Sequence, residues 1–203
     1  MKENLSGNFG NQILYDMCVV APKHTDDDVI SGKVWLIGRA YAAAIERRAT
    51  GRYAEEARRD ETKDLHRLIA PEIRNSPLDH WLASISEVEA VDEGHLPQVL
   101  AIHWEFVELL KRLTGRQRPS FASKYLHFHQ PRAFFIYDSR ASKEIRKKVP
   151  GRGNGKPPAG CEACHNGYAA FVRRCLQYRD EQAKARNEHP MTPRELDREL
   201  LQY

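Results

Sequence analysis

The chain has 203 residues, of which 41% are hydrophobic and 30% charged, and its formal net charge is +4. This length and apolar content suit a folded domain with a sizeable core and exclude an intrinsically disordered chain. No run approaches the ~18 consecutive apolar residues of a membrane span, and the N-terminal MKENLSGNFG lacks the layout of a secretory signal. We therefore expect a cytoplasmic protein with no membrane partner and no obligatory protein partner.

Apolar residues recur at helical spacing along most of the chain, whereas strand-like alternation is scarce. Thr25 and the three aspartates after it predict the N-cap and acidic first turn of a helix that Gly51 ends. A second helix is expected over about 53–70. Ser76 and Pro77 predict the N-cap and first position of a third.

The second half of the chain continues this helical pattern. Helices are expected over 96–113, before Gly115, and from Ser120 to Phe128, before a proline break. Asp138 or Ser139 can cap the next helix, which runs to residue 149. The sequence thus predicts a compact all-α, multi-helix domain.

Two more helices are expected near the C-terminus, which brings the total to about seven or eight. One covers about 162–186, and the other begins at Thr192-Pro193 with Glu195 as its capping-box acid. We expect residues 1–150 to form a helical core and residues 151–160 a flexible basic loop. Residues 161–203 should then pack their helices on the same domain.

The four cysteines are expected to be reduced thiols, because nothing in the sequence signals export. They are Cys18, Cys161, Cys164 and Cys175. The last three, with the adjacent His165, do not make a set of four ligands at zinc or iron–sulfur spacing. We expect neither a metal nor a cofactor.

A basic segment spans residues 143–156, which are rich in Lys and Arg and contain a single Glu. Such a patch favours polyanions, above all nucleic acid, through counterion release. The plainer interpretation is a solvated helix face followed by a loop.

The segment from Leu113 to Arg140 reads LTGRQRPSFASKYLHFHQPRAFFIYDSR. It resembles the helix-hairpin-helix DNA glycosylase superfamily, in which a glycine-containing hairpin precedes a helix, an apolar stretch with a proline, and a catalytic aspartate. Here the string Ile136-Tyr137-Asp138-Ser139-Arg140 stands where that aspartate lies. The resemblance implies a similar helical fold and an enzyme that hydrolyses the N-glycosidic bond of a damaged or modified base. Asp138 would stabilise the oxocarbenium-like sugar and activate water.

The hairpin itself departs from the family pattern, and two registers remain open. One places Leu113–Arg118 at the hairpin and Pro119 where bifunctional members carry a nucleophilic lysine. The other uses Arg118–Ala122 and places Lys124 there, but shortens the following helix by about one turn. We favour the first register, which predicts a monofunctional, water-using enzyme with Lys124 as the less favoured catalytic residue.

The partner implied by this resemblance is double-stranded DNA with one base flipped out of the stack. Aromatic residues and histidines are candidates to line the base pocket: Tyr41, Tyr125, His127 and Tyr137. Polar and basic residues are candidates to bind phosphates: Arg39, Arg116, Arg118, Ser120, Arg140, Lys143, Arg146, Lys147, Lys148 and Arg152. An activity of this kind would act in DNA repair or in defence against modified phage DNA.

Three other interpretations compete with this one. Asp138 can simply cap a helix, which is worth about 1 kcal/mol. The string from Arg74 to His80 resembles the R-N-x4-H motif of HEPN ribonucleases, which are also all-α, and in which the Arg and His face an RNA phosphate. A non-enzymatic DNA-binding protein, with helix 139–149 lying on the DNA backbone, would need neither site.

Overall fold

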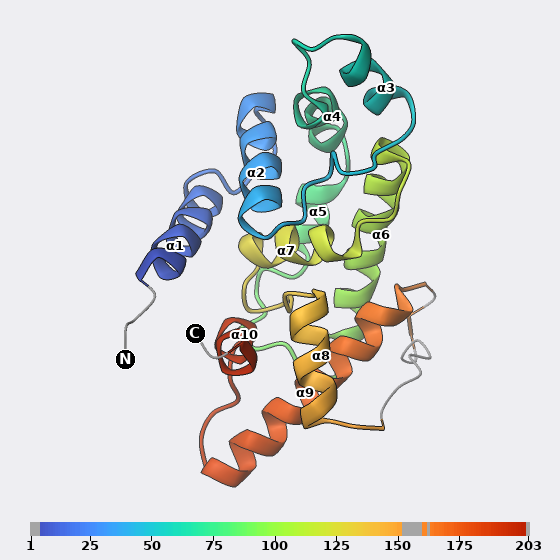
Figure 1. Ribbon diagram of the computed structural model, residues 1–203. Coiled ribbons are helices and arrows are strands. Elements are labelled where there is room, and N and C mark those ends of the chain that lie inside the picture. The colour runs from blue at the N-terminus through green and yellow to red at the C-terminus, as the bar shows by residue number, and fades with distance from the viewer. Residues whose placement is uncertain (1–4, 152–159, 162, 202–203) are drawn as a thin grey trace.

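The computed structural model describes residues 5–151, 160–161 and 163–201, and within them the chain is helical with no β-strand (Figure 1). The ten helices there are α1 (Leu5–Val20), α2 (Asp27–Ala40), α3 (Arg52–Arg59), α4 (Leu65–Arg74), α5 (Leu78–Ala83), α6 (Leu96–Thr114), α7 (Pro119–His129), α8 (Ser139–Lys148), α9 (Asn166–Arg186) and α10 (Pro193–Leu201). The all-α prediction is confirmed, although the helices are more numerous than expected. In the described part of the chain, no helix is both long and apolar enough to cross a membrane.

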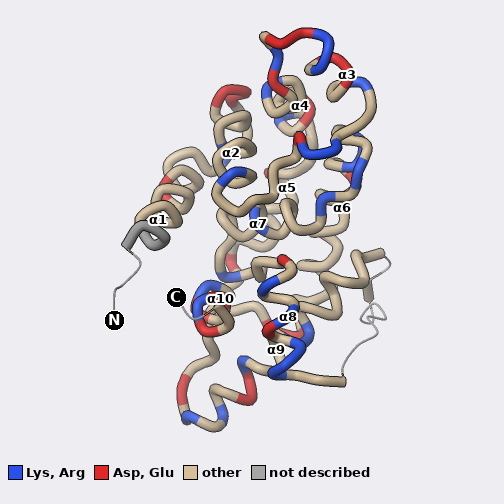
Figure 2. The backbone as a smooth tube through the Cα atoms, viewed as in Figure 1, with Lys and Arg blue, Asp and Glu red and all other residues tan. Residues whose placement is uncertain are grey.

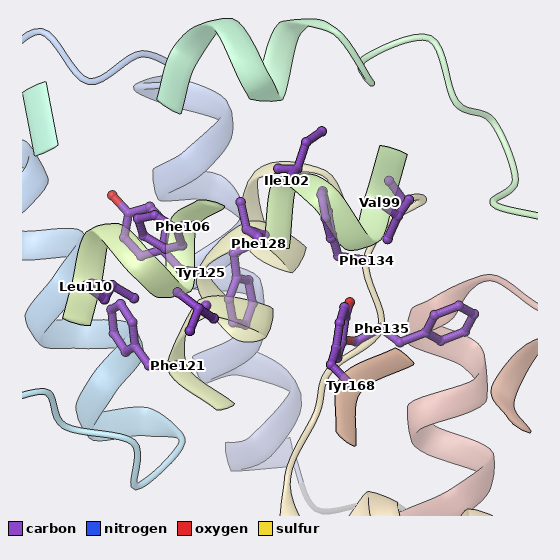
Figure 3. Packing of buried hydrophobic residues seen from close by; sticks show 14 of the residues in the cluster. Val99, Ile102, Phe106, Leu110, Phe121, Tyr125, Phe128, Phe134, Phe135 and Tyr168 are labelled. Atoms are coloured by element: carbon purple, nitrogen blue, oxygen red, sulfur yellow. The ribbon is translucent and has the colours of Figure 1, made fainter. Parts of the chain in front are cut away.

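Helix α7 lies at the centre of the molecule, between α2 and α6 on one side and the group α8, α9 and α10 on the other (Figure 1). Every side chain from Phe121 to Phe128 is buried, so the helix is surrounded on all faces. Phe121, Tyr125 and Phe128 pack with Phe106 of α6 in the core (Figure 3). A helix buried all round must also find partners for its polar side chains.

The polar side chains of α7 bind the extended segment that follows it. Ser123 Oγ accepts from the backbone N–H of Tyr137 at 3.0 Å, and His127 Nδ1 donates to the carbonyl of Phe134 at 2.7 Å. Lys124 Nζ donates to the carbonyl of Tyr137 at 3.1 Å. These side chains thus bind three backbone groups of the segment, which ends directly before Asp138.

The N-terminal third differs most from the prediction. Helix α1 was not expected, and α2 is shorter than its pattern suggested. Asp26, not Thr25, caps α2, because its carboxylate accepts from two backbone N–H groups of the first turn. The helix ends at Ala40, since Gly38 lies so close to Ala44 that the chain must turn back on itself there.

The helix expected over 53–70 is two helices, because the chain breaks between α3 and α4. Asp60 forms a local turn there, accepting from the backbone N–H and hydroxyl of Thr62. Helix α5 begins one residue later than predicted: Pro77 is its N-cap, and Ser76 Oγ accepts from the N–H of Leu78 at 3.3 Å.

The predicted ends of the later helices agree better with the structure. Gly115 closes α6 in the left-handed conformation, and Asp138 caps α8. Thr192 and Glu195 form the predicted capping box, in which the Thr192 N–H donates to Glu195 Oε2 at 2.7 Å. Helix α9 starts later than expected, after His165 as N-cap. Of the predicted loop 151–160, residues 152–159 lie outside the described residues.

Substitution of Gly115 by alanine is expected to destabilise the fold. Its φ of 69° costs an alanine about 1–2 kcal/mol, and an added Cβ would overlap Thr50 Oγ1. Urea denaturation should therefore show a loss of at least about 2 kcal/mol in the free energy of unfolding. The same substitution at Gly32, which has open space around it, is the control. Equal stabilities of the two variants would contradict this role for Gly115.

Candidate functional site

The carboxylate of Asp138 stands at the N-terminus of α8 and is held from two sides. Its Oδ1 accepts from the backbone N–H of Ala141 at 2.9 Å, which is the N-cap bond. Its Oδ2 lies 3.8 Å from Lys124 Nζ, at ion-pair distance. The side chain remains 26% exposed, so the carboxylate is fixed in orientation yet open to solvent.

Lys124 approaches Asp138 from α7, and its side chain is fully buried. Its ammonium donates to Ser120 Oγ at 2.8 Å and to the Tyr137 carbonyl at 3.1 Å. It also lies 5.7 Å from the centroid of the Tyr41 ring, within range of a cation–π contact. The structure therefore brings together Asp138 and the lysine that the sequence favoured less, whereas Pro119 begins α7 and its carbonyl accepts from His103.

Burial and the neighbouring charges shift the pKa of Lys124 in opposite directions. Burial lowers the pKa of Lys124, while the nearby carboxylates of Asp138 and Asp197 raise it. Burial also raises the pKa of Tyr41 to about 12, so this phenol is protonated at neutral pH. The Tyr41 hydroxyl donates to Asn11 Oδ1 of α1 at 2.8 Å, which fixes its ring against the site.

The four candidates for a base pocket separate into two groups. Tyr125 and His127 are fully buried and hydrogen bonded to His24 and to the Phe134 carbonyl, respectively. They belong to the core, because α7 is enclosed on every face. Tyr41 and Tyr137 are only partly buried. Of these two, Tyr41 borders Lys124 directly, as described above.

Tyr137 precedes Asp138, but its ring packs against α9. Its ring centroid lies 5.3 Å from that of Phe171 and 5.8 Å from that of Tyr168. Its hydroxyl sits over Gly167, where an added Cβ would come within 2.7 Å of it. The contribution of Tyr137 to the site is therefore its backbone carbonyl, which accepts from Lys124.

The exposed face of α8 carries five of the basic residues selected from the sequence (Figure 2). They are Arg140, Lys143, Arg146, Lys147 and Lys148. Lys147 pairs with Glu144 at 2.7 Å, and Lys148 lies over the ring of Tyr178. Because Asp138 caps this same helix, its carboxylate borders a cationic surface.

The remaining candidates for phosphate binding have different surroundings. Arg39 and Arg116 are exposed, whereas Arg118 donates to the backbone carbonyls of Ile45 and Arg47 at 2.8 and 2.9 Å. That guanidinium is thus a structural tie between α7 and the turn after α2. Ser120 is the partner of Lys124, as described above. Arg152 lies outside the described residues.

The cysteines are free thiols. Cys175 is buried in α9. The pKa of Cys164 is raised to about 11, mainly by burial and to a smaller extent by the neighbouring Cys161. Within the described ranges, no cluster of three or more His, Cys, Asp or Glu side chains could hold a metal ion.

The residues of the ribonuclease-like string lie on α4 and α5. The Arg74 guanidinium is 3.1 Å from Asp27 Oδ2, and His80 is exposed. Asp79 between them binds His24 at 2.5 Å. Arg74 thus ties α4 to α2, and Asp79 ties α5 to the connection between α1 and α2; nothing in these contacts favours an RNA site.

Sequence reasoning missed two residues next to the site, Arg194 and Asp197 of α10. Both are buried, and Arg194 Nη1 lies 3.1 Å from Asp197 Oδ2. A signal was present in the sequence: Arg194 and Asp197 share the helix face of the apolar Leu200 and Leu201, where a solvated pair is not expected.

A surface hollow of about 680 Å³ lies elsewhere, at the C-terminal end of α9, and shares no residue with the Asp138 site. Its lining includes Arg179, Lys184 and Asn187.

Comparison of the chain with protein-family models, with curated proteins and with solved structures gave no match.

Proposed function

We propose that the protein is a DNA glycosylase that hydrolyses the N-glycosidic bond of a damaged or modified base. The observation that carries the proposal is the Asp138 carboxylate: one oxygen is tied into the α8 N-cap, the other faces Lys124, and the side chain remains open to solvent. A carboxylate that is fixed in orientation and open to solvent is accessible to a bound sugar, and this supports the proposal.

The chemistry suits a single fixed carboxylate. As the bond to the base breaks, positive charge develops on the sugar, and a nearby anion stabilises that transition state. The same carboxylate can orient the attacking water and take its proton. A base within a duplex must first be flipped out, at a cost of a few kcal/mol.

The cationic face of α8 supports DNA as the substrate. Phosphates of a strand lying along Arg140, Lys143 and Arg146 would place a sugar near the N-terminus of the helix, where Asp138 lies. Binding through these residues should weaken steeply with salt, because each phosphate contact releases counterions. Tyr41, at the edge of the site, is the aromatic residue best placed to meet an extruded base.

Lys124 has the surroundings of a positioning residue. Its side chain is 0% exposed, and its ammonium donates to Ser120 Oγ and the Tyr137 carbonyl. An attacking amine would have to leave these partners and reach solvent. We therefore favour water as the nucleophile, with Lys124 orienting Asp138.

The test is direct release of a base. The protein is incubated with duplex DNAs carrying oxidised, alkylated or bulky phage-type bases, and free base is measured by mass spectrometry together with alkali-labile abasic sites. We expect release from at least one class, with no covalent complex after borohydride treatment. A trapped complex that is lost in Lys124→Arg would instead identify Lys124 as the nucleophile. Salt-sensitive DNA binding with no product from any substrate would overturn the glycosylase proposal. An ordinary lesion as substrate would point to repair, and a phage-type base to defence.

A further inference from the structure

The inner face of α10 contains a buried pair of opposite charges. The exposed fractions of Arg194 and Asp197 are 9% and 4%, and their side chains are joined at 3.1 Å. Both residues lie among buried apolar neighbours of the same helix, including Leu196 and Leu200. Helix α10 packs against α8, which Asp138 caps (Figure 1).

Arg194 extends toward Tyr15 and Tyr41, of which Tyr41 borders the site. Its guanidinium carbon lies 6.0 Å from the ring centroid of Tyr15, and its charge also acts on the Tyr41 hydroxyl. The Tyr15 hydroxyl is 2.6 Å from His127 Nε2 on α7. Arg194 thus lies where α1, α7 and the turn after α2 meet.

Asp197 of α10 is a second carboxylate whose charge raises the pKa of Lys124. The groups that act on the Lys124 ammonium come from three elements: Asp138 caps α8, Asp197 lies on α10, and the Tyr41 ring follows α2. Ser120, on α7 itself, accepts a hydrogen bond from it. The charges of two carboxylates therefore act on this lysine, and only one of them, Asp138, is at the proposed reaction site.

A buried ion pair is a costly way to attach a helix. The desolvation of two charges commonly offsets their attraction, and apolar residues of similar volume would hold α10 at least as well. The same helix already has an ordinary surface pair, Glu199 with Arg186, at 3.0 Å and partly exposed. The pair lies on the helix that packs against α8, and the charge of Asp197 acts on the site lysine, so a role beyond attachment follows.

We propose that Arg194 and Asp197 are positioning residues of the Asp138 site: Asp197 shares the Lys124 ammonium with Asp138, and Arg194 holds Asp197, Tyr15 and Tyr41 in place. This inference rests on the proposed glycosylase function. It makes the C-terminal helix a part of the site, although more than 50 residues of sequence separate α10 from Asp138.

The charge coupling can be measured without any substrate. In isotopically labelled protein, NMR follows the Cε resonance of Lys124 with pH, and the signal is assigned by its loss in Lys124→Arg. Asp197→Asn removes a negative charge near the ammonium, so the pKa of Lys124 should fall by about one unit. Glu199→Gln, on the outer side of the same helix, is the matched control and should leave that pKa unchanged.

The second measurement is the pH dependence of base release. If the Lys124 ammonium orients Asp138, activity is lost as Lys124 deprotonates, so the alkaline limb should move to lower pH in Asp197→Asn by the same amount. Asp197→Glu should restore the wild-type limb. If Asp197→Asn does not fold, it is replaced by the double variant Arg194→Met with Asp197→Leu. This variant exchanges the charged pair for an apolar pair.

The outcomes distinguish a failure of the positioning role from a failure of the glycosylase function. Shifts of both the NMR titration and the rate profile support the positioning role. An unchanged Lys124 titration, or a shifted titration with an unchanged rate profile, overturns it. A wild-type protein that releases no base from any substrate overturns the glycosylase function, while the NMR titration still tests the coupling of Asp197 to Lys124.

Discussion

Replacement of Asp138 by asparagine is expected to reduce base release about 10³-fold while leaving the fold intact. Asparagine has nearly the same volume and is as good an N-cap as aspartate, so the bond to the Ala141 N–H can be kept. What is lost is the negative charge that faces the sugar and the base that deprotonates water, and losses of this kind cost two to three orders of magnitude or more. Single-turnover release of the base at neutral pH measures this effect.

The control for this substitution exists elsewhere in the chain. Asp26 likewise caps a helix, α2, accepting from the N–H groups of Asp28 and Val29 at 2.8 and 3.1 Å, but it is exposed and borders no lysine of the site. Asp26→Asn should leave base release unchanged. DNA binding should survive both substitutions, because the cationic face of α8 is untouched. If Asp138→Asn retains wild-type release, Asp138 is only a cap.

The parts of this structure that the sequence predicted are those determined by a few neighbouring residues. The Asp138 cap, the end of α6 at Gly115 and the capping box of Thr192 and Glu195 each depend on atoms within about one helical turn. Such local preferences point to the same structure in the isolated sequence and in the fold. The candidate carboxylate and the helix it caps could therefore be identified before the fold was known.

The environment of that carboxylate could not be predicted in the same way. Whether Lys124 reaches Asp138 depends on the rotation of α7 and on the path of the segment 133–137, both of which are set by tertiary packing. The enclosure of α7 also decides that Tyr125 and His127 are core residues, although their sequence pattern equally suits a pocket. The charge of Asp197 acts on Lys124 only because α10 packs against α8.

The chain should lose stability in mild acid because histidines are buried in its core. His103 and His127 are both inaccessible to solvent, and burial lowers their pKa values to about 3 and about 4. At pH values above 6.5 both rings are neutral in the folded and the unfolded chain, and their contribution to stability is fully present. Below pH 6.5 the unfolded chain takes up protons that the folded chain does not, so stability falls as the pH decreases toward 4. Each ring should cost about 2 kcal/mol at pH 5.

Urea denaturation at pH 7.5 and pH 5 tests this expectation, and variants that keep the hydrogen bonds isolate the contribution of each ring. His103 Nε2 donates to the Pro119 carbonyl at 3.0 Å, a position that a glutamine amide can reach, whereas His127 Nδ1 donates to the Phe134 carbonyl, which suits asparagine. His103→Gln and His127→Asn should each reduce the difference in unfolding free energy between the two pH values by about 2 kcal/mol, whatever their stability at pH 7.5. His80→Gln, at an exposed ring, should leave that difference as in the wild type. A wild-type protein equally stable at both pH values would mean that the buried rings accept protons in the folded state. The close packing of His103 on Tyr168, with ring centroids 3.7 Å apart, argues against such protonation.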